Sequence, residues 1–206
     1  MVNTAITYTR RYFFYGHNID TTVTKDPYAV NAWITETESI YRNHRGIIGL
    51  DTEWRPSFQP GVQDPIAILQ LCVDNRCLVF QIIHSGQFLP LSLINFLNNP
   101  NYTFTGVGIN TDIQKLLRCG LGRGPNCFLS DMVNIQQLAA WKFGLQSMDR
   151  LNMNVLARDV LGIDLAEPGN VRISAWDNRF LTDEQVRYAS LDAFLSSEMG
   201  KALLTD

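Results

Sequence analysis

Long apolar runs are missing from this sequence, and their absence limits where the protein can act. No apolar stretch approaches the ~20 residues of a membrane-spanning helix. The first residues also lack the apolar core of about 7–15 residues that follows the basic residues of a signal peptide. We therefore expect a soluble, intracellular protein that is not secreted, works in the nucleus or the cytoplasm, and has no contact with a membrane.

Cysteine is also scarce, with four residues in the whole chain: Cys72, Cys77, Cys119 and Cys127. No CxxC spacing and no histidine pair accompanies them, which argues against a structural zinc site. Cys72 and Cys77 lie in apolar, strand-like sequence, where free buried thiols are the usual finding. We expect free thiols at these two positions and a reducing compartment.

Positive charge is limited, and only four of the 17 basic residues are lysines. The formal net charge is −3 and the sequence pI is about 5.6. Domains that hold nucleic acid by a general basic surface usually lie above a pI of about 9, so the charge argues against this class. An enzyme that grips only a few nucleotides is not excluded. The arginines suit bidentate phosphate contacts and surface ion pairs equally well.

What the sequence does contain is an ordinary globular composition, with 46% hydrophobic and 18% charged residues. We find no internal repeat, low-complexity tract or linker, and 206 residues favour one domain. We expect a single domain over residues 1–206, made of an N-terminal hairpin and helix (1–45) and a motif-bearing core (46–206).

Periodicity and turn residues predict alternating strands and helices. Asp26 and Pro27 are typical of a helix start, Ser130 and Asp131 are read as a cap, and Thr182 with Gln185 fits a capping box. The predicted strands are 10–15, 21–23, 46–51, 66–73, 77–83 and 102–107, and the predicted helices are 27–41, 91–97, 110–117, 131–143, 151–161 and 182–204. This order indicates an α/β fold, a mixed sheet of about five to six strands flanked by helices.

Two carboxylates stand at the end of the predicted strand that begins at residue 46. Because residues i and i+2 of a strand project to the same face, Asp51 and Glu53 emerge together. Their spacing suits the binding of divalent ions. Taken alone, the pair is better explained as the end of a strand that turns into a polar loop.

Two further motifs carry polar residues in helical contexts. Tyr188 and Asp192 lie one turn apart on one face of the last helix. Asn110 and Asp112 follow two glycines where a strand ends and a helix begins. Each motif also has a structural interpretation. Tyr188 could be a half-buried aromatic and Asp192 a solvated charge, whereas Asn110 could cap the helix and Asp112 could stabilise its N-terminus.

Together these motifs resemble those of the DEDDy 3′→5′ exonucleases of the ribonuclease H-like superfamily. The shared patterns are Asp-x-Glu after a strand, Gly-x-Gly-x-Asn-x-Asp opening a helix, and Tyr-x-x-x-Asp in a late helix. The run Asp-Thr-Glu-Trp-Arg-Pro at 51–56 is similar to the Werner-syndrome-like exonucleases of plants. Residues 66–71 look like that family's second strand, and Ser174-x-Trp176 looks like its approach to the third motif.

The resemblance implies a ribonuclease H-like fold and hydrolysis of nucleic acid from the 3′ end by two divalent ions, Mg²⁺ or Mn²⁺, with release of nucleoside monophosphates. It implies that Asp51, Glu53 and Asp192 hold the ions, and that Asp112 acts on the second ion through water. Tyr188 would orient the attacking water rather than deprotonate it, since a phenol with a pKa near 10 is a poor match for that task.

Contacts to the substrate are predicted at three residues: Trp54, Asn110 and Arg172. Trp54 and the nearby Phe58 could stack on terminal bases or belong to the core. Arg172 could bind phosphate or serve as a surface charge.

Two other functions remain open from the sequence. One is a nucleic-acid-binding domain that keeps the fold without turnover, and the other is a phosphodiesterase acting on small nucleotides. The choice between DNA and RNA also stays open, because no residue is identified that reads the 2′-hydroxyl. The oligomeric state stays open as well: assembly into a homo-oligomer would help a small acidic chain to grip a long polymer.

Overall fold

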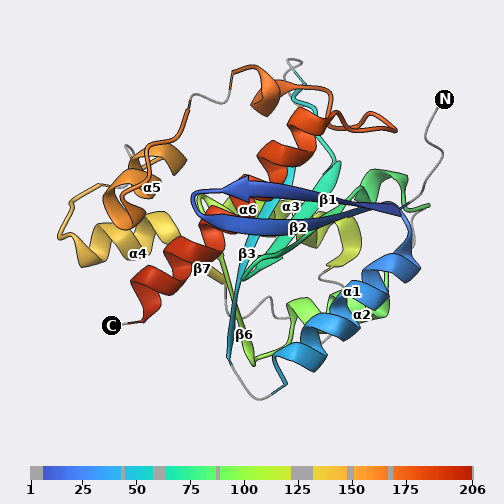
Figure 1. Ribbon diagram of the computed structural model, residues 1–206, viewed down its shortest axis with the longest axis horizontal. Coiled ribbons are helices and arrows are strands. Elements are labelled where there is room, and N and C mark those ends of the chain that lie inside the picture. The colour runs from blue at the N-terminus through green and yellow to red at the C-terminus, as the bar shows by residue number, and fades with distance from the viewer. Residues whose placement is uncertain are drawn as a thin grey trace.

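A mixed sheet forms the centre of the molecule in the computed structural model, which describes residues 7–42, 45–57, 64–86, 89–121, 132–147, 151–166 and 169–205. The sheet has seven strands among these residues, in the order β1-β2-β5-β4-β3-β6-β7 (Figure 1). The strands are β1 (Thr7–Phe14), β2 (His17–Thr24), β3 (Gly46–Glu53), β4 (Ile68–Val73), β5 (Arg76–Phe80), β6 (Tyr102–Gly106) and β7 (Met132–Asn134).

The strand directions place the first motif at the middle of the sheet. Strands β3, β4 and β5 form an antiparallel meander, while β6 runs parallel to β3 and β7 parallel to β6. The N-terminal hairpin β1–β2 extends the other edge, with β2 parallel to β5. The carboxyl end of β3, where Asp51 and Glu53 stand, is paired with β4, whereas β6 pairs only with the first half of β3, Gly46 to Gly49.

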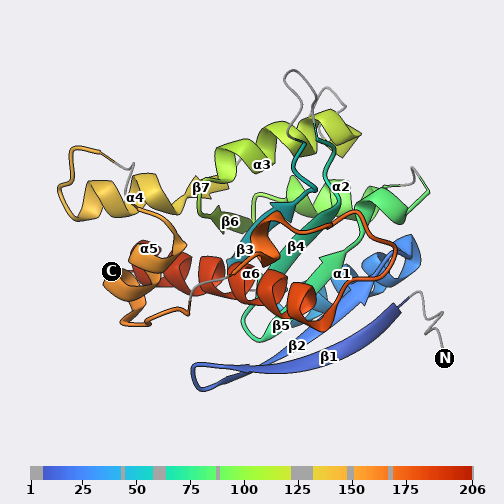
Figure 2. The ribbon, with the colours of Figure 1, turned by 90° about the horizontal axis from the view of Figure 1, so that it is seen from above.

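Helices cover both faces of this sheet (Figures 1 and 2). One apolar core joins a face of the sheet to α1 (Pro27–Ile40), α2 (Leu91–Leu97) and α3 (Ile109–Leu116). A second core joins the opposite face to α4 (Ile135–Lys142), α5 (Met153–Leu161) and α6 (Asp183–Leu204). Three short helical turns complete the described elements: η1 (Ile82–His84), η2 (Leu117–Leu121) and η3 (Val171–Ile173).

The long helix α6 lies directly on the central strands. The predicted capping box is present, with the Thr182 hydroxyl and the Gln185 side chain each bonding the other's backbone. A Cβ added at Gly49 of β3 would stand 1.8 Å from the backbone oxygen of Ala193. A glycine at this position is therefore required for the helix to approach the strand this closely, which brings Asp192 over the end of β3.

The number of strands and the start of α4 differ from the prediction. Residues 132–134 form β7, which was predicted as helix. The side chain of Asn134 caps α4 by accepting from the backbone N–H of Gln136. Ser130 and Asp131, the predicted cap, lie outside the described residues. A strand of three residues is too short to show the period-two alternation that identifies longer strands. Asparagine is as good an N-cap residue as serine or aspartate, so the cap position could not be decided from residue type alone.

The prediction of free thiols at Cys72 and Cys77 is wrong. The two residues form a disulfide, with Cα atoms 4.1 Å apart. The two-residue turn at Asp74 and Asn75, which was predicted, places the cysteines directly opposite each other in β4 and β5. The spacing rules applied to the sequence describe metal knuckles rather than hairpin register, so they could not reveal the pair.

None of the helices in the described part of the chain combines the length and the apolar character that a membrane-spanning segment requires.

Candidate active site

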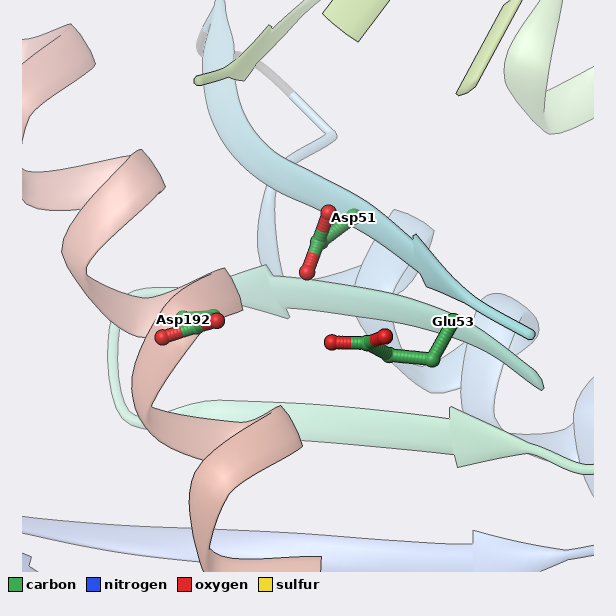
Figure 3. Close-up of side chains that lie close together, drawn as sticks. All are labelled: Asp51, Glu53 and Asp192. Atoms are coloured by element: carbon green, nitrogen blue, oxygen red, sulfur yellow. The ribbon is translucent and has the colours of Figure 1, made fainter. Parts of the chain in front are cut away.

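Three carboxylates from two elements converge beside the end of β3. Asp51 and Glu53 project from the face of β3 that α6 covers, and Asp192 projects from α6 toward them (Figure 3). One oxygen from each carboxylate lies within 4.8 Å of the other two, a group that could hold a metal ion. The structure thus brings Asp192 together with two carboxylates that precede it by 141 and 139 positions in the sequence, Asp51 and Glu53.

Burial makes this cluster electrostatically unfavourable on its own. Glu53 and Asp192 are each only 8% exposed. None of the ion pairs found among the described residues involves Asp51, Glu53 or Asp192. Carboxylates placed together out of water need a cation or a proton to balance their charge.

The acidities of the three groups reflect that imbalance. Burial, and then the charges of Asp112 and Glu53, raise the pKa of Asp51 well above its ordinary value. Burial, and then the charge of Asp192, raises the pKa of Glu53 to about 9. Burial raises the pKa of Asp192 to about 7, although the hydroxyl of Tyr188 and the nearby charge of Arg172 lower it.

Asp112 stands beside the cluster but on the other side of β3. It lies in the first turn of α3, and the hydroxyl of Thr52 donates a hydrogen bond to its carboxylate (2.5 Å). Thr52 alternates with Asp51 and Glu53 along the strand, so its side chain points to the opposite face. Burial raises the pKa of Asp112 to about 6, and the positive charge of Lys115 opposes this shift. Its charge nevertheless acts on both Asp51 and Glu53.

Tyr188 precedes Asp192 by one turn of α6 and is half-buried. The charge of Asp192 acts on its hydroxyl, and its ring packs against that of Trp176 with centroids 6.1 Å apart. Burial, followed by the charges of Asp192 and Glu53, raises the pKa of Tyr188 far above its ordinary value. The phenol therefore keeps its proton and is a hydrogen-bond donor at this site.

A cavity of about 900 Å³ opens beside the carboxylates. This volume is within the range of about 300–1,000 Å³ typical of ligand pockets. All five predicted catalytic residues line it. Of the predicted substrate contacts, Trp54 and Arg172 line the cavity, whereas Asn110 is exposed and outside the lining. Asn110 does not cap α3 either, since Gly108 with φ 73° occupies the cap position. Phe58 lies outside the described residues.

Other polar residues of the cavity wall were missed from the sequence: Tyr15, Gln136, Asn152, Glu184 and Arg187. Glu184 lies four residues before Tyr188, so the helical spacing that linked Tyr188 to Asp192 could have identified it. Tyr15 stands in the turn of the N-terminal hairpin with φ 45°, and no sequence signal connected that turn to the motifs.

Comparison with known proteins agrees with this geometry. The model of the 3′-5′ exonuclease family matches residues 25–205. A 3′-5′ exonuclease of Arabidopsis thaliana is 35% identical over 167 residues, which cover 79% of this chain and 54% of the relative. The bifunctional 3′-5′ exonuclease/ATP-dependent helicase WRN of Mus musculus is 32% identical over 164 residues, which cover 79% of this chain and 11% of the relative. The chain thus spans about half or less of the length of these relatives.

The likeness extends to the fold. The crystal structure of the Aedes aegypti Nibbler EXO domain superposes with a TM-score of 0.69 at 21% identity, covering 88% of this chain and 85% of that chain. The predicted ribonuclease H-like α/β fold is confirmed, with seven strands in the described sheet. The match of the family model over most of the chain shows that this chain belongs to the 3′-5′ exonuclease family.

Proposed function

We propose that this chain is a single 3′→5′ exonuclease domain that hydrolyses phosphodiester bonds of nucleic acid from the 3′ end and releases nucleoside monophosphates. The observation that carries the proposal is the group of Asp51, Glu53 and Asp192, the last two buried, beside a cavity of about 900 Å³. Membership of the 3′-5′ exonuclease family supports the same reaction.

The donor set fits divalent ions of the Mg²⁺ or Mn²⁺ type. These hard cations prefer oxygen ligands, and every donor in the cluster is a carboxylate oxygen. Asp51, Glu53 and Asp192 would hold metal directly, and Asp112, held apart by Thr52, would act through water on a second ion. Two such ions stabilise the charge that develops on the attacking and the leaving oxygen of a phosphodiester.

The remaining residues of the cavity would position the substrate and the water. Tyr188, which keeps its proton, would donate a hydrogen bond that orients the attacking water beside Asp192. Arg172, whose positive charge acts on Glu53 and Asp192, would contact a phosphate at the cavity wall.

Trp54 would provide a stacking surface for a terminal base. Its ring lines the cavity, and the ammonium group of Lys115 lies 3.9 Å from the ring centroid. Stacking of a base on an aromatic side chain is tolerant of sequence and contributes about 1–3 kcal/mol. We propose no substrate contact for Asn110, which lies outside the cavity lining. Assembly into a homo-oligomer stays a prediction.

The direct test is incubation of the protein with single-stranded, duplex and recessed DNA and RNA oligonucleotides in Mg²⁺ or Mn²⁺. We expect mononucleotide release that a chelator stops. Asp51→Asn should lower the rate by at least about 100-fold, because it removes a metal ligand. Asp159→Asn is the matched control: that residue is exposed and paired with Arg158, and its loss should leave the rate unchanged.

Two outcomes would contradict the proposal. Binding of oligonucleotides without turnover in either metal would indicate a silent binding domain. Hydrolysis of a mononucleotide ester with no action on any oligomer would indicate a phosphodiesterase for small nucleotides.

A further inference from the structure

A buried glutamine stands next to the carboxylate cluster, on the strand beside the first motif. Gln70 of β4 is the direct partner of Asp51 of β3 in the antiparallel register. Directly opposed residues of antiparallel strands project to the same face, with Cβ atoms about 4.5–5.5 Å apart. Gln70 and Asp51 therefore share the face covered by α6, where β4 passes alongside β3 behind the labelled carboxylates (Figure 3).

The amide of Gln70 is completely buried and has no hydrogen-bond partner. Its exposed fraction is 0%, and neither its oxygen nor its nitrogen is bonded within the described part of the chain. Apart from Asp51, its neighbours on the same face of the sheet offer no hydrogen-bond partner. Ile68 in β4 and Val79 across in β5 are apolar, and Cys72 in β4 is part of the disulfide between β4 and β5. Among these sheet neighbours, Asp51 is the one group that can accept a hydrogen bond from the amide.

Two other buried glutamines show what this fold ordinarily does with such a group. The Gln185 amide donates to the Ser174 hydroxyl and to the Ala175 carbonyl. The Gln81 amide donates to the Asn178 carbonyl. An unbonded amide in the core is costly, and an apolar side chain of the same volume would avoid that cost. The position of Gln70 thus indicates that its amide has a functional role at the carboxylate cluster.

We propose that Gln70 is a positioning residue: its amide, unbonded in this structure, donates a hydrogen bond to the Asp51 carboxylate when a divalent ion binds, and so fixes the orientation in which Asp51 holds that ion. The inference rests on the proposed function of the cluster. An ionised carboxylate only accepts hydrogen bonds, so the amide nitrogen is a matching donor. Carboxylates that bind metals are generally held by such outer hydrogen bonds, and losing one lowers metal affinity or activity by about 10–100-fold.

The test variant is Gln70→Met, which keeps length and volume and removes both polar atoms. Titration calorimetry of Mn²⁺ into the metal-free protein should show a dissociation constant raised about 10–100-fold. The kcat on an oligonucleotide should fall while its KM stays unchanged. Leu69→Met is the matched control, since Leu69 is equally buried in β4 but projects to the other face. It should bind Mn²⁺ like the wild type.

A residue that merely fills the core would behave differently. In that case Gln70→Met would bind Mn²⁺ with wild-type affinity, which would overturn the inference while leaving the proposed function intact. Wild-type protein that binds neither Mn²⁺ nor Mg²⁺ would instead overturn the proposed function and this inference with it.

A measurement on the wild-type protein tests the proposal even if the Gln70→Met variant fails to fold. In NMR spectra, saturation with Mg²⁺ should shift the side-chain amide signals of Gln70 more than those of Gln81 and Gln185, which are bonded elsewhere. Gln70 signals that stay in place while Mg²⁺ binds would contradict the proposed hydrogen bond.

Discussion

Asp192 illustrates how single residues of the cluster favour metal binding over stability. Its carboxylate is almost completely buried beside Asp51 and Glu53, and its folded-state pKa is raised from 3.8 to about 7. The folded protein therefore holds this proton at pH values where the unfolded chain has released it. As a result, the free energy of unfolding of the metal-free protein falls as the pH rises from about 4 to about 7.

Asp192→Asn should therefore stabilise the metal-free protein while abolishing hydrolysis. The gain should be small at pH 4.5 and largest at pH 8, up to about 4 kcal/mol, since one pKa unit corresponds to about 1.4 kcal/mol. Thermal unfolding in chelator at the two pH values measures it. Asp20→Asn serves as the control, because a hydrogen bond from Arg11 lowers the pKa of Asp20 and its loss cannot stabilise the fold in this way. A variant less stable than the wild type at pH 8 would contradict the account.

Local sequence was sufficient to propose these residues but not to give their geometry. Strand alternation placed Asp51 and Glu53 on one face, and helical spacing placed Tyr188 and Asp192 on another. Whether the two faces meet depends on packing between residues that are far apart in the sequence. Local periodicity carries no information about such packing. The unbonded amide of Gln70 is likewise invisible in sequence, where it reads as one polar residue in an apolar strand.

At the scale of elements, the contact between β3 and α6 sets the position of Asp192 relative to Asp51. The contact is closest at Gly49, where any Cβ would collide with the backbone oxygen of Ala193. A backbone atom cannot rotate away as a side chain can, so α6 itself would have to shift. Gly49 thus acts on the site without touching it.

Gly49→Ala should lower stability by about 1–3 kcal/mol, the typical cost of overpacking, and should also weaken Mn²⁺ binding. The control is Thr182→Ala, which removes the α6 cap at a cost of about 1 kcal/mol and leaves the helix in place. Denaturant unfolding together with calorimetric titration separates the two effects. Equal Mn²⁺ affinity in both variants would show that the close approach does not position Asp192.

The elements that could be predicted were those with strong local signals. The start of α1 at Asp26 and Pro27 and the capping box of α6 are both present in the structure. The misplaced start of α4 and the missed strand β7 arise where a strand of three residues pairs with β6, and only the rest of the sheet specifies that pairing. The Cys72–Cys77 disulfide depends on register in the same way.

At the scale of the whole molecule, one sheet and its helices bring the catalytic motifs together from distant parts of the chain. The first motif ends β3, Asp112 opens α3 after β6, and α6 carries the third motif across the face of the central strands. The N-terminal hairpin, which precedes all three motifs, brings Tyr15 to the same cavity. The fold class followed from the order of strands and helices, whereas the hairpin's contribution to the cavity is visible only in three dimensions.

The central claim is that this cavity accepts the 3′ end of a nucleic acid for metal-dependent hydrolysis. The most direct measurement compares one oligonucleotide labelled at its 5′ end with the same oligonucleotide labelled at its 3′ end, each incubated with Mg²⁺ or Mn²⁺. We predict that the 3′ label leaves first as a mononucleotide while the 5′ label stays on a ladder of shortening products. Release of the 5′ label as a mononucleotide, or internal cuts with both labels, would contradict the account.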